Sequence, residues 1–191
     1  ITKWNLSRFA ECLIPLIDKN QNKAVEQASE IISSFEKKYE EKWLNMMRDK
    51  LGLFGVDEKD KYLILDLLTW MHQEKMDYTN TFCHLMNIKI QNKENFKKTD
   101  FENWKKRWQE RLKINNNTPE KYLKLMRSVN PLVIPRNHKV EEVLNEANNG
   151  NIEPFNQFLE VLNKPYLEQK NIINYQIPLS SNEKYQTFCG T

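Results

Sequence analysis

Glycine is scarce in this sequence. Only four glycines occur among its 191 residues, at positions 52, 55, 150 and 190. A Gly-rich phosphate-binding loop needs two or three glycines within about seven residues, so that the backbone can approach a phosphate group. No stretch of the sequence meets this requirement, so neither familiar type of nucleotide-binding loop is expected in this chain.

Cysteine is scarce as well. The three cysteines, Cys12, Cys83 and Cys189, are an odd number and form no Cys-x-x-Cys pair. A disulfide-stabilised secreted domain normally has an even number, and a structural zinc site needs its cysteines or histidines at short spacings. Both classes are disfavoured, and a reducing compartment is expected.

Long apolar runs are missing. The longest, residues 63–68, is interrupted by Asp66 and is far shorter than the roughly 20 residues that cross a bilayer. The sequence starts at Ile1 inside an amphipathic pattern, without the features of a signal peptide. We therefore expect no membrane partner and interpret the chain as a piece of a longer protein.

An excess of charge of one sign is also missing. Lys and Arg number 29 and Asp and Glu 26, which gives a net charge of +3 spread along the whole chain. Nucleic-acid-binding proteins usually concentrate their positive charge on one surface. The net charge therefore does not indicate a particular binding partner, and we expect no binding to nucleic acid.

Apolar residues recur at helical spacing along most of the sequence, which predicts an all-α fold. We expect a helical region over residues 1–165 and an irregular tail over 166–191, without a clear boundary between domains inside the helical region. The expected helices cover residues 4–17 and 23–50, follow N-caps at Asp57, Asp77, Asp100 and Thr118, and form a hairpin over residues 140–162.

Two connections have a distinct composition. Residues 87–99 are polar and rich in lysine without a period, which predicts an exposed loop. Pro131 and Pro135 bracket Leu132, Val133 and Ile134, which predicts an extended stretch.

Basic residues surround Trp104 and Trp108, among them Arg107 and Arg111, in an arrangement that could bind single-stranded nucleic acid. Both tryptophans, however, share a helical stripe with Phe101 and Leu112. The spacing therefore predicts that the tryptophans lie in the core and that the lysines face water on the opposite side of the helix.

The other reactive side chains favour structural roles. Histidines 72, 84 and 138 have no metal-binding spacing, and the adjacent residues Cys83 and His84 would point about 100° apart on a helix. Asp77, Tyr78 and Thr79 resemble an acidic metal-binding triplet, but Asp77 stands where a helix cap is expected. Cys12 and Cys83 fall within helical patterns and are interpreted as small residues in or near the core.

Cys189 is different because it lies third from the end, after Tyr185 and Phe188. A thiol near a chain terminus is accessible to oxidants and to distant partners. Cys189 is therefore a candidate redox residue, with an inert terminal cysteine as the alternative.

Several segments together resemble the C-terminal part of the selenoprotein O family, also called YdiU, of protein adenylyltransferases with a pseudokinase fold. The run Asn130–His138 and the terminal Cys189 carry the most specific part of this resemblance. One departure is Pro178 followed by Leu179, where many members have two prolines. The matching residues are Trp4, Asn5, Leu6 and Arg8; Trp43, Met47, Arg48, Lys50, Leu51 and Gly52; Asp77, Tyr78, Thr79 and Phe82; Trp104, Arg107, Trp108, Arg111 and Leu112; Asn130, Pro131, Ile134, Pro135, Arg136, Asn137 and His138; and Pro165, Tyr166, Cys189, Gly190 and Thr191.

The resemblance implies a protein that binds ATP with Mg or Mn and transfers AMP to hydroxyl side chains of other proteins. The family's ATP-binding and catalytic residues precede the segment that matches Ile1, so no catalytic, cofactor-binding or metal residue is assigned to this chain. The chain would form the end of a kinase-like large lobe with added helices and a tail. Its partners would be the N-terminal catalytic part of the same protein and the substrate proteins.

The resemblance also implies that Cys189 is a redox thiol able to bridge to another cysteine, with the family's usual partner upstream of this chain. It implies a cytoplasmic location, or a mitochondrial one in a eukaryote. The alternative function is a free-standing helical module that binds other proteins and has no enzymatic activity.

Overall fold

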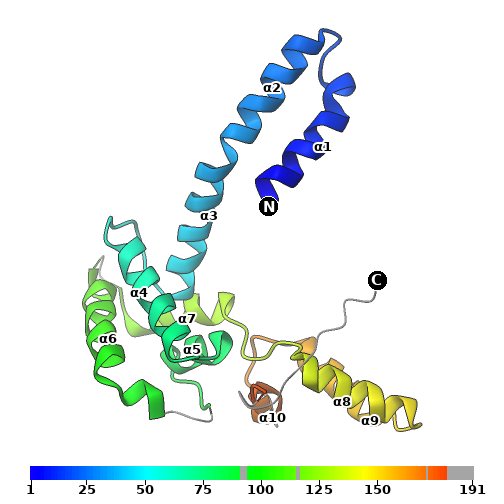
Figure 1. The fold of residues 1–191 in the computed structure, drawn as a ribbon. Coiled ribbons are helices and arrows are strands. Elements are labelled where there is room, and N and C mark those ends of the chain that lie inside the picture. Colours follow the sequence, from blue (N-terminus) through cyan, green and yellow to red (C-terminus); the bar gives the residue numbers. More distant parts are fainter. Residues whose placement is uncertain (91–93, 115–116, 171, 180–191) are drawn as a thin grey trace. The chain divides into compact units, whose positions relative to one another are not determined.

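The computed structural model describes residues 1–90, 94–114, 117–170 and 172–179, and every regular element in this part of the chain is helical (Figure 1). The all-α prediction is confirmed. The chain divides into two compact units, residues 1–47 and 48–191, a division that the sequence pattern does not predict. The elements are α1 (Thr2–Ile17), α2 (Gln21–Ser33), α3 (Phe35–Lys50), α4 (Asp60–Gln73), α5 (Tyr78–Leu85), η1 (Glu94–Lys97), α6 (Thr99–Leu112), α7 (Pro119–Val129), α8 (Asn137–Asn148), α9 (Glu153–Leu162) and α10 (Ile172–Gln176).

The long helix expected over residues 23–50 is two helices, α2 and α3. Its start is earlier than expected, because the Asn20 side chain caps α2 by accepting hydrogen bonds from the backbone N–H groups of Asn22 and Lys23. The helix is interrupted at Ser34. The hydroxyls of Ser33 and Ser34 donate to the backbone carbonyls of the preceding turn, in competition with the helical pattern.

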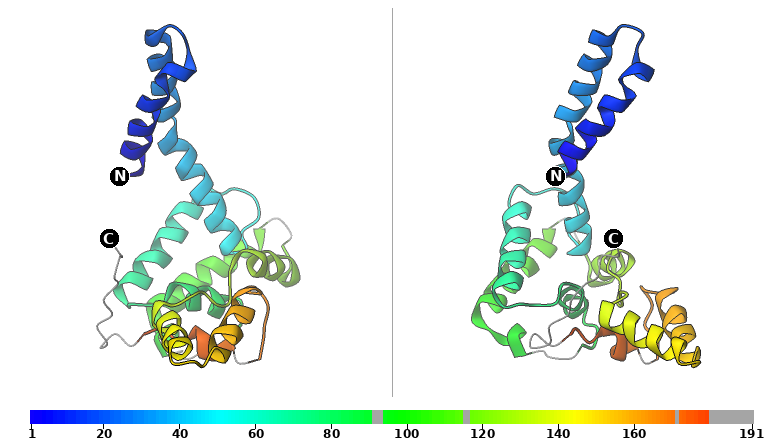
Figure 2. Two further views of the ribbon diagram at one scale, coloured as in Figure 1. Left: turned by 90° about the vertical axis from the view of Figure 1, so that its right-hand side faces the viewer. Right: turned by 45° about the vertical axis from the view of Figure 1, so that its right-hand side comes forward.

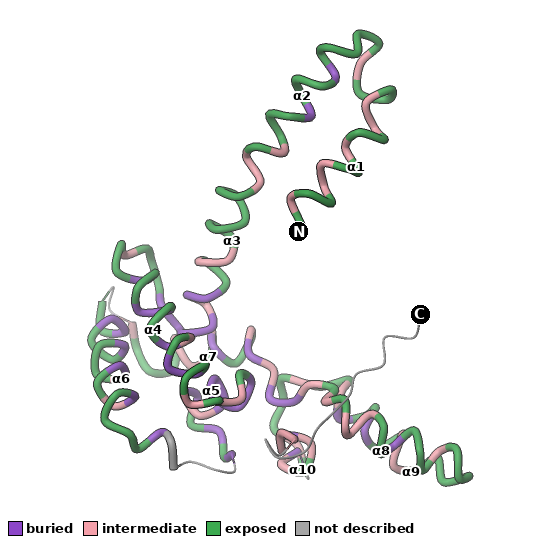
Figure 3. Tube along the Cα trace, viewed as in Figure 1, coloured by how far each residue is buried: buried purple, intermediate pink, exposed green. Residues whose placement is uncertain are grey.

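The first unit is an α1–α2 hairpin followed by most of α3, and it buries few side chains (Figure 3). Ala24, Ala28 and Met47 are its buried residues, and every residue of α1 keeps exposed surface. Cys12 is exposed, so its expected place in or near the core is wrong. The reason is its position on α1, roughly opposite the Ser7–Ala10–Ile14 face that meets α2.

The second unit has a core of large apolar side chains between α4, α5, α6 and α7. Helices α4 and α6 pack side by side, and Figure 2 shows them from two further directions. Trp104 and Trp108 are buried as predicted. Their indole N–H groups donate to the backbone carbonyls of Leu63 and Leu51 at 2.8 and 2.9 Å, so neither ring is presented for stacking with a nucleic-acid base.

The expected helix starts are partly confirmed. Asp77 is the N-cap of α5, and its Oδ1 accepts the backbone N–H of Asn80 at 2.8 Å. Thr118 occupies the N-cap position of α7, but its side chain forms no capping hydrogen bond with the described residues. The N-caps expected at Asp57 and Asp100 are wrong, because Asp57 forms a turn before α4 by binding the Lys59 N–H, and Asp100 lies inside the first turn of α6.

The connection expected to be an exposed loop over residues 87–99 is anchored in the core. Ile88, Ile90 and Phe96 are buried, and residues 94–97 form the 3-10 helix η1. The sequence-based prediction of an exposed loop failed because a few isolated apolar residues in a polar segment produce no regular spacing of apolar residues. Phe96 stacks on His84 with a distance of 3.9 Å between ring centroids.

The end of the chain contains the expected hairpin of α8 and α9, which pack against each other. A short helix, α10, follows inside the stretch that the sequence pattern leaves irregular, and its Ile172 and Gln176 are buried. The helix is only five residues long, which is too short for a periodic pattern to be recognised in the sequence. Residues 180–191, including Cys189, lie outside the described residues.

Candidate functional site

The carboxylate of Asp60, the first residue of α4, is completely buried. Its Oδ1 accepts a hydrogen bond from Arg111 Nε at 2.7 Å, and its Oδ2 accepts from Arg48 Nε at 2.7 Å and from the Asp57 backbone N–H at 3.0 Å. Burial alone would raise the pKa of Asp60, but the hydrogen bonds from Arg111 and Arg48 outweigh it and hold the pKa below its usual value. This carboxylate is therefore ionised at neutral pH and joins the ends of three helices.

Arg111 also binds the loop between α3 and α4 through hydrogen bonds. Its Nη2 donates to the backbone carbonyls of Phe54 and Gly55 at 3.2 and 3.3 Å. Arg111 is itself buried. The spacing from Trp104 to Trp108 to Arg111 continues the buried stripe of α6, and this was the available signal in the sequence.

A second ion pair joins Asp77, at the start of α5, to Arg136, which precedes α8. Nη1 and Nη2 of Arg136 donate to the two carboxylate oxygens of Asp77 at 2.7 and 2.8 Å. Such a paired geometry is the strong form of an arginine–carboxylate contact. Two segments that carry the family resemblance therefore meet here, and Asp77 acts as a helix cap and ion-pair partner.

Lys50 and Cys83 lie near this ion pair and are both buried. Lys50 Nζ lies 4.4 Å from the ring centroid of Phe82 and 5.2 Å from that of Tyr78, and burial lowers the pKa of Lys50. Burial, and then the charge of Asp77, raises the pKa of Cys83 to about 12, although Arg136 and Lys50 oppose the shift. Cys83 is therefore a neutral thiol at pH 7 and a poor nucleophile.

Buried amides hold the segment around Pro131. Asn130 Nδ2 donates to the backbone carbonyls of Lys50 and Met126 at 2.9 and 2.8 Å. The side-chain Nε2 of Gln176 in α10 donates to the Leu132 backbone carbonyl at 2.8 Å, and the backbone carbonyl of Gln176 accepts from Asn80 Nδ2 at 3.0 Å. The Asn130–Arg136 run therefore connects α3, α5, α7 and α10, which explains its specific sequence.

A cavity of about 510 Å³ lies beside Asp60, between the start of α4 and the end of α6. Tyr62, Leu63 and Ile114 supply apolar walls, and Arg107 and Arg111 supply positive charge. Both arginines are paired with aspartates, Arg107 with Asp66 at 2.8 Å and Arg111 with Asp60. The charges of these two arginines are thus already paired with carboxylates of the chain.

The other candidate residues form no further site in the part of the chain that the structure describes. Within the residues that the structure describes, no three His, Cys, Asp or Glu side chains gather in a way that could hold a metal ion, and no helix is long and apolar enough to cross a membrane. Cys189, the candidate redox residue, lies outside the described residues together with Tyr185 and Phe188. The ion pairs of Asp60 and Asp77 are the interactions that the sequence pattern misses.

Comparison of the sequence with known proteins shows the family to which this chain belongs. Residues 1–163 match the model of the family described as "Protein adenylyltransferase SelO". Over its whole length the chain is 55% identical to a protein of Pelagibacter ubique named protein nucleotidyltransferase YdiU, and it covers 40% of that protein. Proteins of the same name from Alcanivorax borkumensis and Nitrosococcus oceani are 45% and 42% identical to the chain, which covers 40% and 39% of them. The chain therefore spans about 40% of the length of these relatives, and it belongs to the SelO family of nucleotidyltransferases.

Proposed function

We propose that this chain is the helical C-terminal scaffold of a protein adenylyltransferase, an enzyme that transfers AMP from ATP to Ser, Thr or Tyr hydroxyls of proteins. In this proposal the chain completes a kinase-like large lobe, and the ATP-binding and catalytic residues belong to the rest of the full-length protein. Support comes from the family match and from the relatives, which are much longer than the chain.

Among the residues that the structure describes, the paired carboxylates Asp60 and Asp77 and the scattered glycines do not fit ATP or a catalytic metal ion. Metal-bound phosphates need free carboxylates and a backbone that can approach the phosphate oxygens. Asp60 and Asp77 each accept hydrogen bonds from arginines, and the glycines are isolated along the sequence. We therefore place the ATP and Mg or Mn sites elsewhere in the full-length protein and derive no catalytic step from this chain.

The observation that carries the scaffold role is the pairing of Asp60 and Asp77 with arginines that come from distant helices. Asp60 lies 51 residues from Arg111 in the sequence, and Asp77 lies 59 residues from Arg136. These contacts join the C-terminal end of α3 to α4 and α6, and the start of α5 to the segment before α8. Such a framework can support an active site through shape alone.

The proposal includes the redox role that the family resemblance implies for Cys189, and a reducing compartment such as the cytoplasm, or the mitochondrion in a eukaryote. Among the described cysteines, Cys12 is exposed and Cys83 is buried. The raised pKa of Cys83 makes it a poor partner for thiol–disulfide exchange. This favours a partner for Cys189 other than Cys83.

The test compares the full-length protein with this chain alone, each incubated with Mg or Mn and with ATP labelled at the α- or the γ-phosphate. The full-length protein should label itself or a generic acceptor protein such as casein from α-labelled ATP. It should leave no label from γ-labelled ATP, because AMP transfer keeps only the α-phosphate.

The isolated chain should give no label with either nucleotide, and circular dichroism on the same sample establishes that its helices are present. Metal-dependent AMP transfer by the isolated chain would overturn the scaffold role. Labelling of the full-length reaction from γ-labelled ATP would instead identify a phosphoryl transferase.

A further inference from the structure

Helix α1 carries a row of large apolar side chains that keep exposed surface among the residues that the structure describes. Leu6, Phe9, Leu13 and Leu16 follow one another at intervals of three, four and three residues, which is the spacing of a helix-packing seam. We call these four residues the α1 stripe. Phe9 is 61% exposed and Leu16 is 81% exposed, whereas Leu6 and Leu13 are half-buried.

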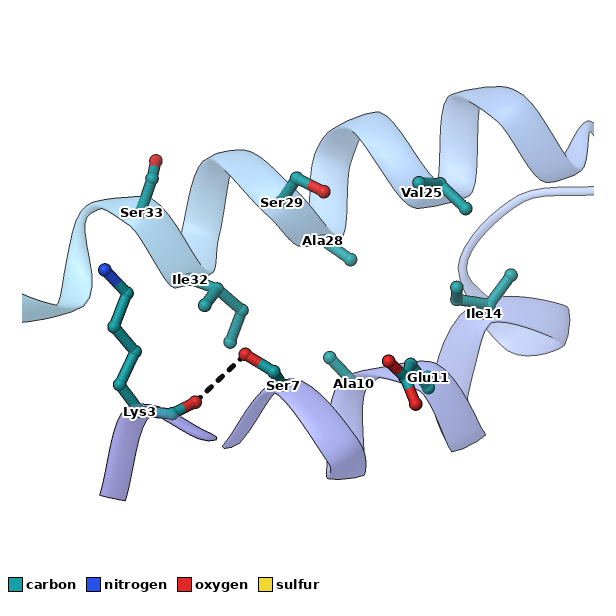
Figure 4. A pocket seen from close by; sticks show the side chains of 10 residues that line it. All are labelled: Lys3, Ser7, Ala10, Glu11, Ile14, Val25, Ala28, Ser29, Ile32 and Ser33. Carbon is teal, nitrogen blue, oxygen red and sulfur yellow. Dashed lines mark hydrogen bonds between the residues drawn. The ribbon is translucent and has the colours of Figure 1, made fainter. Parts of the chain in front are cut away.

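The α1–α2 hairpin packs through a different face. The cavity of about 310 Å³ between the two helices is bordered by the small residues Ser7, Ala10, Ala28 and Ser29 together with Ile14, Val25 and Ile32, and no residue of the α1 stripe lines it (Figure 4). The α1 stripe is therefore not required for the packing of α1 against α2.

The composition of α1 fits a helix with a second packing partner. Its charged residues are Lys3, Arg8 and Glu11, and none of them belongs to the α1 stripe. An apolar surface that extends beyond the face packed on one neighbour indicates a second packing surface. The other helices of the first unit also carry exposed large apolar side chains, such as Ile31 and Tyr39.

We infer that the α1 stripe is a docking seam for the part of the full-length polypeptide that lies outside this chain. This inference rests on the proposed function, since it assigns a surface to the catalytic part as partner. That part makes up well over half of the length of the relatives. Because it belongs to the same polypeptide, its effective concentration at the seam far exceeds that of a second copy in solution.

The experiment places the photo-crosslinker p-benzoyl-phenylalanine at position 9 of the full-length protein, where it replaces another aromatic residue, Phe9. A second variant carries it in place of Leu16. The matched control replaces Glu26, an exposed residue of α2 on the side away from Ala24 and Ala28. After irradiation and digestion, mass spectrometry identifies the peptide attached to each position.

We expect both stripe positions to cross-link within one polypeptide to peptides outside residues 1–191, at a yield at least about tenfold above that of the Glu26 control. Cross-links to residues 48–191, a product of twice the monomer mass, or a yield equal to the control would each overturn the inference. The readout is independent of catalysis, so a full-length protein that transfers no AMP would contradict the proposed function and leave this result intact.

Discussion

Arg111 holds Asp60 by two nitrogens, with Nε on one carboxylate oxygen at 2.7 Å and Nη2 on the other at 3.2 Å. The Asp60 side chain has no exposed surface and that of Arg111 has 8%. Removing both charges from water is costly, so the intact pair adds little net stability compared with apolar residues. Removing one partner leaves the other charge buried and uncompensated, which is strongly destabilising.

We predict that Asp60→Asn lowers the free energy of unfolding by about 3 kcal/mol, because Arg48 and Arg111 lose their common counter-charge in a buried site. Urea unfolding followed by tryptophan fluorescence measures the change. The matched control is Asp66→Asn, which removes the exposed pair with Arg107 and should cost less than about 0.5 kcal/mol. Equal costs for the two variants would contradict the role of burial.

The same residue predicts a dependence of stability on pH. Because the folded state lowers the pKa of Asp60, its contribution is present above the pKa of the unfolded chain, about 3.9. The contribution is lost as the pH falls through the lower, folded pKa. Unfolding free energies measured from neutral to acid pH should therefore fall more steeply for the wild type than for Asp60→Asn. Parallel curves would show that Asp60 does not titrate as described.

Two substitutions at Asp77 separate its two roles. Asp77→Asn keeps a side-chain oxygen that can cap α5 but loses the charge that binds Arg136. Asp77→Ala loses both, so it should be less stable than Asp77→Asn by about 1 kcal/mol, which is the usual contribution of an N-cap. Chemical denaturation measures the difference. Equal stability of the two variants would indicate that the cap contributes nothing.

Gly52 is predicted to resist substitution. Its φ of +70° favours glycine, and a Cβ there would lie 2.9 Å from Tyr122 Cβ. Gly52→Ala should cost about 2 kcal/mol or more, from backbone strain and from the clash. Gly150→Ala, with φ of +91° and nothing within 4 Å of the added Cβ, should cost only about 1 kcal/mol. A smaller cost at Gly52 than at Gly150, measured by thermal unfolding, would contradict the close approach.

The cysteines should differ in reactivity. In a Cys189→Ser background, iodoacetamide at pH 7 should modify Cys12 at least about 100-fold faster than Cys83, because alkylation requires an exposed thiolate. Cys83 is buried and has a pKa raised to about 12, whereas Cys12 is exposed. Mass spectrometry of timed samples gives both rates. The two rates should converge in concentrated urea, and convergence in the native protein would contradict the burial of Cys83.

The helical class, the α8–α9 hairpin and the cap at Asp77 were all predictable, because each depends on local periodicity or on a residue beside a helix start. The burial of Trp104 and Trp108 was predictable for the same reason. The interruption at Ser34 was not, because the apolar pattern continues across it while the serine hydroxyls compete locally for carbonyl groups.

The ion pairs of the candidate site were hidden for a different reason. A period shows which face of a helix is buried, but it does not show which distant side chain meets that face. Arg111 shares a face with Trp108, yet its partner Asp60 lies in another helix. Nothing in the sequence distinguishes Asp60 from the other acidic residues. The contact between Asp77 and Arg136 depends in the same way on the path of the chain between them.

The long sequence separations of these ion pairs bear on the order of folding. Asp60 is synthesised 51 residues before Arg111, and Asp77 is synthesised 59 residues before Arg136. The pairs with Arg111 and Arg136 therefore cannot form during synthesis until those later arginines have emerged, and Arg48 is the earlier partner of Asp60. The folding rate of the second unit should be set by the closure of these long loops and not by the formation of individual helices.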